Sequence, residues 1–228
     1  MSRGWLSVFA KAPRPGRVKT RMSPPLSLEQ AAALYDAMLS DVLIASADFA
    51  QRLDLEPVLY FDPPDAKDEL ARRAPRAYQL RAQVGLDLAE RMANAFEQAE
   101  AAGAERVLLR GSDSPGLDYA TVEDAFDRLD AGQDLVLTPD QGGGYVLIAL
   151  KKPQHELFEI ELSTGSVLTE TLARARSLGL EASLTRASFD VDRSPDLARI
   201  DDLAPEQSSV LCPRTVEILR DLRRGFVL

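Results

Sequence analysis

The 228-residue sequence is poor in the side chains that most often carry enzymatic chemistry. It contains one cysteine, Cys212, and one histidine, His155. A single cysteine excludes a disulfide framework within the chain and a cysteine-rich zinc site. A catalytic dyad or triad built on histidine would depend on His155 alone, and His155 has no second histidine with which to share a metal. Because it stands in P-Q-H-E-L-F, typical of the start of a surface helix, we interpret it as an exposed structural residue.

Long apolar runs are also missing. No stretch approaches the ~20 consecutive apolar residues of a membrane-spanning helix, and the first residues, M-S-R-G-W, do not resemble a secretory signal. The net charge of −9 and the pI near 4.8 argue against general binding to nucleic acid. We therefore expect a cytoplasmic protein with no membrane span and no nucleic-acid partner. The oligomeric state is left open.

Strand and helix patterns alternate along the chain, which predicts an α/β fold. We expect one domain over residues 1–228, with a mostly parallel, Rossmann-like sheet and helices on both faces. The run at residues 145–150 follows the previous strand after a short loop and is the candidate for an antiparallel exception. The expected strands are Trp5–Ala10, Pro57–Phe61, Ala77–Arg81, Arg106–Arg110, Leu135–Thr138, Tyr145–Leu150 and Glu181–Thr185.

Helix starts are marked by local signals. The segment S-L-E-Q from Ser27 is a capping box, in which the serine and the glutamine three residues later satisfy each other's backbone N–H groups. Asp118 is well placed to cap a helix over Tyr119–Leu129. Apolar stripes at helical spacing follow Leu88 and Leu168, and Ser194 precedes a proline in the order expected of a helix start.

The basic residues are concentrated near the beginning of the chain. Residues 1–28 hold six of them and no acidic residue, and five lie in the stretch K-A-P-R-P-G-R-V-K-T-R, from Lys11 to Arg21. This stretch lies between an expected strand and an expected helix, where α/β proteins bind phosphates. The alternative is a solvated basic loop. Because the loop lies outside the expected core, we expect Lys19 to contribute little to stability.

Two nucleotide-binding motifs are excluded. Gly16–Thr20 lacks the adjacent Gly-Lys and the earlier glycine of a P-loop, and no G-x-G-x-x-G follows a strand. A Walker-type ATPase and a dinucleotide-dependent oxidoreductase are therefore not expected.

Acidic residues follow three of the expected strands. Asp113 comes just after Arg106–Arg110, among small residues, where open α/β sheets bind ligands. Because Mg²⁺ is usually held by one or two carboxylates and by phosphate oxygens, Asp113 is a candidate metal ligand; the alternative is a helix cap. Asp190 and Asp192 project to one side of an extended segment, and either could reach a metal; the alternative for Asp192 is a cap of the next helix. Asp140 precedes three glycines, which indicate either a hairpin turn or the close approach of a ligand.

Five segments together resemble a known family. They are similar to the bacterial GT-A-like transferases of the nucleotide-diphospho-sugar transferase superfamily, and the resemblance spans residues 5–203. Lys19–Met22 also resembles the K-S-R-L segment of 2-phospholactate guanylyltransferases, and the layout is more distantly similar to that of molybdenum-cofactor guanylyltransferase. The segments are F-A-K-A-P-R-P-G-R-V-K-T-R-M (Phe9–Met22), L-A-E-R-M (Leu88–Met92), G-S-D-S-P-G-L (Gly111–Leu117), G-G-Y-V-L-I-A-L (Gly143–Leu150) and D-V-D-R-S-P-D-L (Asp190–Leu197).

The resemblance implies a GT-A, or nucleotide-diphospho-sugar transferase, fold with a site for each substrate. It implies Mg²⁺, or Mn²⁺, as cofactor, with Asp113 as the main ligand and Asp192 as a second. Catalytic roles fall on Lys11, Lys19, Arg21 and Asp113. The nucleotide would contact Arg14, Gly16, Arg17, Gln83, Gly85 and Asp87, and the acceptor would contact Gly143, Gly144, Tyr145, Ser163 and Thr164.

The chain departs from the family pattern on the acceptor side. The family usually has D-G-G-Y-Y, whereas this chain has Gly142 and Val146 in place of the aspartate and the second aromatic residue, and Leu162 in place of a tryptophan. Three functions stay open. The leading hypothesis is nucleotidyl transfer from a nucleoside triphosphate to a small phosphorylated or anionic acceptor. The alternatives are glycosyl transfer from a nucleotide-sugar and non-catalytic nucleotide binding on the same fold.

Overall fold

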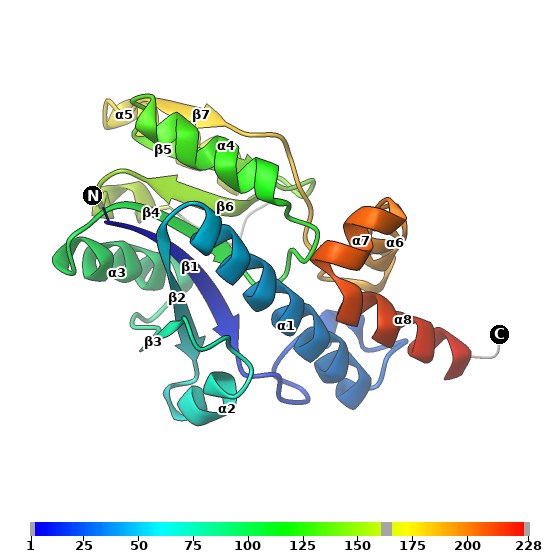
Figure 1. Ribbon diagram of the computed structural model, residues 1–228. Helices are drawn as coiled ribbons and strands as arrows, with labels where there is room; N and C mark the ends of the chain where they lie inside the picture. The colour runs from blue at the N-terminus through cyan, green and yellow to red at the C-terminus, as the bar shows by residue number, and fades with distance from the viewer. Residues whose placement is uncertain (1–2, 161–165, 226–228) are drawn as a thin grey trace.

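The computed structural model describes residues 3–160 and 166–225, and its centre is a twisted sheet of seven strands (Figure 1). The order across the sheet is β3-β2-β1-β4-β6-β5-β7. Each expected strand is confirmed, with small shifts at the ends. The bounds are β1 (Arg3–Lys11), β2 (Leu55–Asp62), β3 (Gln79–Ala82), β4 (Ala104–Gly111), β5 (Leu135–Pro139), β6 (Tyr145–Leu150) and β7 (Ala182–Leu184).

One strand runs against the others. β6 pairs antiparallel with both β4 and β5, whereas the remaining pairs are parallel. The prediction of an antiparallel strand at residues 145–150 is confirmed. The physical reason is the short β5–β6 connection, which allows a hairpin, whereas a parallel strand needs a crossover of a dozen or more residues.

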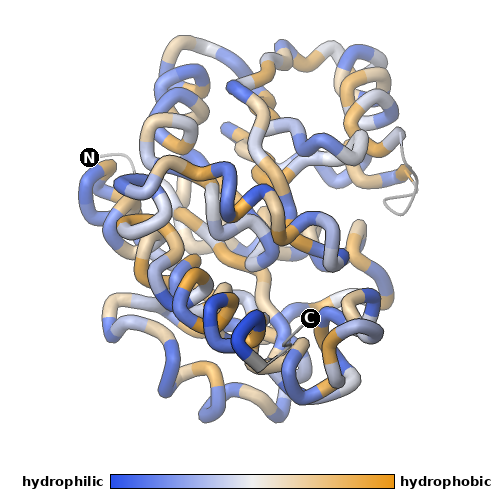
Figure 2. The backbone as a smooth tube through the Cα atoms, turned by 90° about the vertical axis from the view of Figure 1, so that its right-hand side faces the viewer, coloured by the Kyte–Doolittle hydropathy of each residue, from blue (hydrophilic) through white to orange (hydrophobic). Residues whose placement is uncertain are grey.

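Helices cover both faces of the sheet (Figure 1). Helices α1 (Leu28–Arg52) and α4 (Tyr119–Asp130) lie on one face, over side chains such as Leu6 and Leu108. Helices α3 (Leu88–Ala101) and α5 (Val167–Ser177) lie on the other, over Trp5 and Leu109. Successive residues of a strand point to opposite faces. These nearly continuous apolar strands therefore contribute side chains to a hydrophobic core on each face of the sheet. Figure 2 shows hydrophobic and hydrophilic positions alternating along the helices.

A third layer lies outside α1. Helices α6 (Ala198–Asp201), α7 (Pro205–Leu211) and α8 (Pro213–Gly225) pack beside it (Figure 1). The buried carboxylate of Asp41 in α1 accepts hydrogen bonds from the backbone N–H and hydroxyl of Thr215, each at 2.8 Å, which ties α8 to α1. The remaining elements are α2 (Lys67–Ala71) and the 3-10 turns η1 (Thr20–Met22), η2 (Pro64–Ala66), η3 (His155–Phe158) and η4 (Ser194–Leu197).

Several local predictions can be compared with this structure. The capping box at Ser27 and the cap at Asp118 are confirmed. His155 is exposed at the start of η3, as expected, and contacts Glu97 at 3.1 Å. The helix start at Ser194 is shifted by one residue, because Arg193 takes the cap position and the carboxylate of Asp196 accepts from its backbone N–H. Among the described residues, no helix combines the length and apolar character needed to cross a membrane.

The capping box at the start of α1 gives a first testable prediction. Ser27→Ala should lower the free energy of unfolding by about 1 kcal/mol, because the N–H of Gln30 loses its acceptor. That corresponds to roughly 2–4 °C in thermal unfolding for a chain of this size. Ser40→Ala, which removes a hydroxyl from the middle of the same helix, is the matched control and should change little. Equal effects of both substitutions would contradict a capping role.

Candidate functional site

The candidate site lies where the two central strands β1 and β4 end. These strands are parallel, with Phe9 opposite Gly111, so their following loops leave the sheet at the same edge. The chain order also reverses between them, which is where open α/β sheets form a ligand crevice. Two adjoining clefts open there, of about 620 and 880 Å³. Both are lined by Phe9, Arg21, Leu88, Gly111, Asp113 and Asp192.

The loop that carries Asp113 is anchored from several elements. The Ser112 hydroxyl shares a 2.8 Å hydrogen bond with the Tyr35 hydroxyl of α1, which also accepts from the backbone N–H of Lys11 at 3.0 Å. Burial raises the pKa of Tyr35, so its hydroxyl keeps its proton. The Asp113 carbonyl accepts from the N–H of Val191 at 2.9 Å. Asp113 is thus held in place by its neighbours and does not cap the following helix.

Asp192 reaches the same place from the far end of the chain. Val191, before it, is fully buried against the third layer of helices. The carboxylate of Asp196 accepts from the backbone N–H of Asp192 at 3.0 Å. These contacts fix an extended segment beside the Asp113 loop, so the two carboxylates lie close together, each about half exposed.

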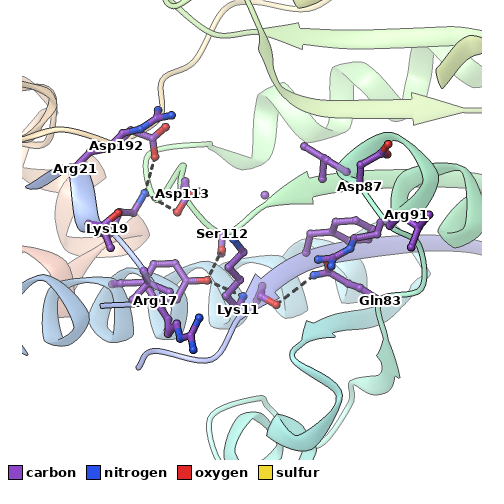
Figure 3. A pocket seen from close by; sticks show the side chains of 18 residues that line it. Lys11, Arg17, Lys19, Arg21, Gln83, Asp87, Arg91, Ser112, Asp113 and Asp192 are labelled. Carbon is purple, nitrogen blue, oxygen red and sulfur yellow. Dashed lines mark hydrogen bonds and ion pairs between the residues drawn. The ribbon is translucent and has the colours of Figure 1, made fainter. Parts of the chain in front are cut away.

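Lys19 lies between these carboxylates (Figure 3). Its Nζ is 2.6 Å from Asp113 Oδ1 and 2.9 Å from Asp192 Oδ1, and its side chain is only 4% exposed. Its backbone is left-handed, with φ of 48°, an uncommon conformation for a residue with a side chain. Burial disfavours the charged form, but the carboxylates outweigh that penalty and raise the pKa of Lys19. The expectation that Lys19 is outside the packed interior is therefore wrong.

Three other cations of the loop line the first cleft. Lys11, Arg17 and Arg21 form no side-chain ion pair with any residue in the ranges 3–160 and 166–225. Arg14 does not belong to this group: its guanidinium pairs with Asp65 and Glu69 beyond the cleft. The assignment of Arg14 to the nucleotide is thus not supported by its position.

Gln83, Leu86 and Asp87, from the loop between β3 and α3, form the opposite wall of the first cleft. The polar side chains among them make contacts that hold the protein's own backbone. The amide of Gln83 donates to the carbonyl of Ala10 at 3.2 Å (Figure 3) and to the carbonyl of Tyr60 at 3.0 Å. Asp87 caps α3 through the N–H of Glu90.

Two predicted glycines act through the backbone and do not line a cleft. Gly85 has φ of +139°, and a Cβ there would lie 2.7 Å from Arg91 N, so only glycine fits against α3. Gly16 has φ of +73° and turns the cationic loop outside the cleft walls.

The second cleft contains the predicted acceptor residues in part. Gly144 and Tyr145 line it, whereas Gly143 does not; its carbonyl instead accepts from the N–H of Leu168 at the start of α5. The glycine run is a hairpin turn, closed by Asp140 Oδ1, which accepts from Gly142 N and Gly144 N at 2.6 and 2.8 Å. Ser163 and Thr164 lie outside the described residues.

The sequence indicates Asp190 only as an alternative metal ligand to Asp192 and does not reveal its environment. It lines the second cleft, and burial, followed by the nearby charges of Asp140, Asp192 and Asp113, raises its pKa to about 7. The sequence signal was its position two residues before Asp192, on the same side of an extended segment. The sequence does not show that Asp190 is partly buried or that Asp140 approaches it from another loop.

The carboxylates of Asp113 and Asp192 fit a divalent cation whose remaining ligands come from the substrate. Mg²⁺ is commonly held by one or two carboxylates together with phosphate oxygens, and Mn²⁺ accepts the same oxygen ligands. In the described part of the chain, no three acidic, histidine or cysteine side chains are grouped as a metal site. The pair therefore fits a metal that arrives with phosphate, and not one held in a preformed protein cage.

The fold is the nucleotide-diphospho-sugar transferase fold. The chain belongs to the family described as "Uncharacterized protein conserved in bacteria (DUF2064)", whose model matches residues 45–164. It is also 32% identical over 189 residues to a 2-phospho-L-lactate guanylyltransferase of Methanothermobacter thermautotrophicus, which covers 80% of this chain and 78% of that protein.

Solved structures agree with this fold. A candidate nucleotide-diphospho-sugar transferase from Desulfovibrio desulfuricans G20 matches with a TM-score of 0.85 and 29% identity, over 98% of this chain and 96% of that one. A 4-diphosphocytidyl-2C-methyl-D-erythritol synthase from Anaerococcus prevotii matches with a TM-score of 0.55 and 10% identity, over 84% and 92% of the two chains. The second likeness shows the fold alone.

The environment of Asp190 predicts a pH effect on stability. Its pKa is higher in the folded protein, about 7, than the ordinary 3.8, so the folded state binds more protons between these values and stability falls as pH rises from 4 to 7. We expect the loss to be on the order of 2 kcal/mol between pH 5 and 7. Asp190→Asn should remove most of this slope.

The measurement is urea unfolding at pH 5 and pH 7 in metal-free buffer, with Asp202→Asn as the matched control, because Asp202 is an exposed acid outside the site. An unchanged slope in the Asp190 variant would contradict the assignment of the effect to this carboxyl.

Proposed function

We propose that this protein is a Mg²⁺-dependent nucleotidyltransferase that joins the nucleotide part of a nucleoside triphosphate to a small phosphorylated or anionic acceptor. The observation that carries the proposal is the meeting of two clefts at the carboxylates of Asp113 and Asp192. A transferase needs separate places for donor and acceptor, with the reacting groups at their boundary. The similarity to a protein named as a guanylyltransferase supports the same reading.

The first cleft suits the triphosphate. Lys11, Arg17 and Arg21 line it without internal ion-pair partners in the described ranges, so their charge is available to a polyanion. A triphosphate carries more negative charge than the diphosphate of a nucleotide-sugar, which favours the nucleotidyl reading over glycosyl transfer.

The second cleft suits an anionic acceptor. Arg21 and Arg193 line it and pair with no carboxylate in the described part of the chain, and Arg199 contacts Asp196 only at 3.9 Å. The carboxylate of Asp140 is engaged with backbone N–H groups of the hairpin. An acceptor phosphate or carboxylate would therefore meet uncommitted cations in this cleft, at the side next to the donor.

The proposed reaction needs little covalent participation by the protein. An acceptor oxygen that is already ionised attacks the α-phosphorus; the new P–O bond forms as the bond to the bridging oxygen breaks, and pyrophosphate leaves with the electron pair. No proton has to move, which suits a chain whose single histidine is remote from the clefts. Bound Mg²⁺ would neutralise phosphate oxygens, while Lys11 and Arg21 hold the charged groups in position.

Ligand binding tests the proposal directly. Thermal-shift measurements with each nucleoside triphosphate and with nucleotide-sugars, with and without Mg²⁺, should show stabilisation by one triphosphate that depends on Mg²⁺. At ligand concentrations of 100 times Kd the gain is about 2.7 kcal/mol. Asp113→Asn should abolish the Mg²⁺ dependence, whereas the surface control Asp127→Asn should retain it. A shift only with nucleotide-sugars would support glycosyl transfer, and no shift with any of these ligands would contradict the proposal.

Lys19 gives a second, sharper test of the carboxylate pair. Because its ammonium neutralises part of the charge of Asp113 and Asp192, it competes with a metal ion for the same oxygens. Lys19→Met should raise the affinity of the nucleotide-free protein for Mn²⁺ about tenfold or more, since charge interactions at this range amount to a few kcal/mol. Without divalent ions, the same variant should unfold at lower temperature, because two carboxylates are left facing each other.

Manganese binding is measured by electron paramagnetic resonance and unfolding by calorimetry. Lys11→Met is the matched control, because Lys11 lines the cleft and pairs with neither carboxylate. Weaker manganese binding in the Lys19 variant than in the wild type would show that the lysine supports the metal site and does not compete with it.

A further inference from the structure

A buried arginine lies directly beneath the candidate site. Arg110, near the end of β4, is 1% exposed. Its strand neighbours are Val8 on β1 and Leu147 on β6, so it occupies the centre of the sheet. It points toward α1, where one guanidinium nitrogen donates to the hydroxyl of Ser46 at 3.3 Å. No part of the proposed chemistry above uses this residue.

The guanidinium has no carboxylate partner in the described ranges. The neighbouring polar side chains are the hydroxyls of Ser46 and Tyr78, and its Nε atom is buried without a hydrogen bond. Burial lowers the pKa of Arg110 to about 10, so it stays charged at neutral pH. A buried charge without a counter-ion opposes folding, and replacing such groups by apolar ones of similar volume is often neutral or stabilising. Stability alone therefore does not account for an arginine here.

The second guanidinium contact points to a role. The other terminal nitrogen of Arg110 donates to the carbonyl of Ser114 at 2.5 Å, within the turn at residues 111–117 that carries Asp113. Ser114 is itself buried, and its carbonyl also accepts from the N–H of Leu117 at 3.3 Å. A hydrogen bond from a charged donor is roughly twice as strong as a neutral one. Lys19 holds the Asp113 side chain of this turn, and Arg110 is a charged anchor of its backbone, on the residue immediately after Asp113.

We propose that Arg110 is a positioning residue, whose buried guanidinium fixes the turn through the Ser114 carbonyl and thereby keeps the Asp113 carboxylate beside Asp192. The link to Asp192 runs through the backbone, because the Asp113 carbonyl accepts from the N–H of Val191. The proposal rests on the proposed function only in treating Asp113 as a metal ligand. Its structural part, the tether, can be tested without any ligand.

The test is Arg110→Met, which keeps a long side chain but removes the charge and the donors. Thermal unfolding should be unchanged or shifted upward. Hydrogen exchange at the amides of Leu117 and Val191 should be about tenfold faster or more, because both amides donate to carbonyls of the tethered turn. Mg²⁺-dependent binding of the triphosphate should weaken about tenfold, with metal-free binding unaffected.

Two matched variants separate the tether from general packing. Ser46→Ala removes the other guanidinium contact, together with the contact of the Ser46 hydroxyl to Tyr78, and should leave both amides protected because the bond to the Ser114 carbonyl remains. Arg110→Lys keeps a charge and a shorter donor group and should give intermediate protection of the two amides from exchange. If the methionine variant does not fold, the lysine variant tests the tether in its place. A third variant, Arg81→Met, removes a partly buried arginine that stacks on Trp5 at 4.7 Å, away from the turn, and should leave exchange at Leu117 unchanged.

The outcomes are distinguishable. Unchanged exchange at Leu117 and Val191 in the methionine variant would overturn the proposal, as would a lower unfolding temperature with faster exchange throughout the protein, which is the signature of a general stabilising residue. Absence of nucleotide binding in the wild type would refute the proposed function, while faster exchange confined to the turn would still establish the tether.

Discussion

The ion contacts of Lys19 with Asp113 and Asp192 are the interaction on which the site depends. They join three segments that are distant in sequence: the loop after β1, the loop after β4 and the extended segment before η4. Two carboxylates this close repel each other unless a cation lies between them. The protein supplies that cation from its own chain, so the pair is held together before any ligand arrives. A lysine suits this role because its ammonium is a compact point charge that can form bonds to both partners.

The same contacts explain why the surrounding structure is so fully anchored. A buried lysine stays charged at low cost only if its carboxylate partners remain within hydrogen-bonding distance. The loops that carry these carboxylates must therefore be held in fixed positions. Tyr35 of α1 holds Ser112, and the backbone N–H of Val191, whose side chain is buried against the third layer of helices, donates to the Asp113 carbonyl. The outer helices α6 to α8 thereby contribute to the position of Asp192, because the segment that bears Asp192 is packed against them.

Much of this could be predicted from the sequence, and the reasons are physical. Strand positions follow from apolar runs, and the antiparallel β6 from a short connection. The capping box at Ser27 is a purely local signal. Side-chain partners are not local: nothing near Lys19 in sequence indicates that it meets Asp192, and nothing near Arg14 indicates Glu69. The sequence therefore indicates where the cationic loop lies, whereas the ion pairs of Arg14 and Lys19 could not be predicted from it, and phosphate binding by the loop stays a prediction.

The distribution of charge shows why the residues around a bound anion matter more for its binding than the net charge of the chain. A chain with a net charge of −9 repels an anionic substrate on average. At physiological ionic strength, however, charges more than about 8 Å apart are largely screened, so a bound anion responds mainly to its immediate surroundings. In the first cleft these include Lys11, Arg17 and Arg21, which form no ion pair in the described ranges, whereas two of the acidic residues that line the same cleft, Asp113 and Asp192, are partly neutralised by Lys19. The overall acidity then opposes non-specific association with polyanions, and the cleft remains attractive to one that fits.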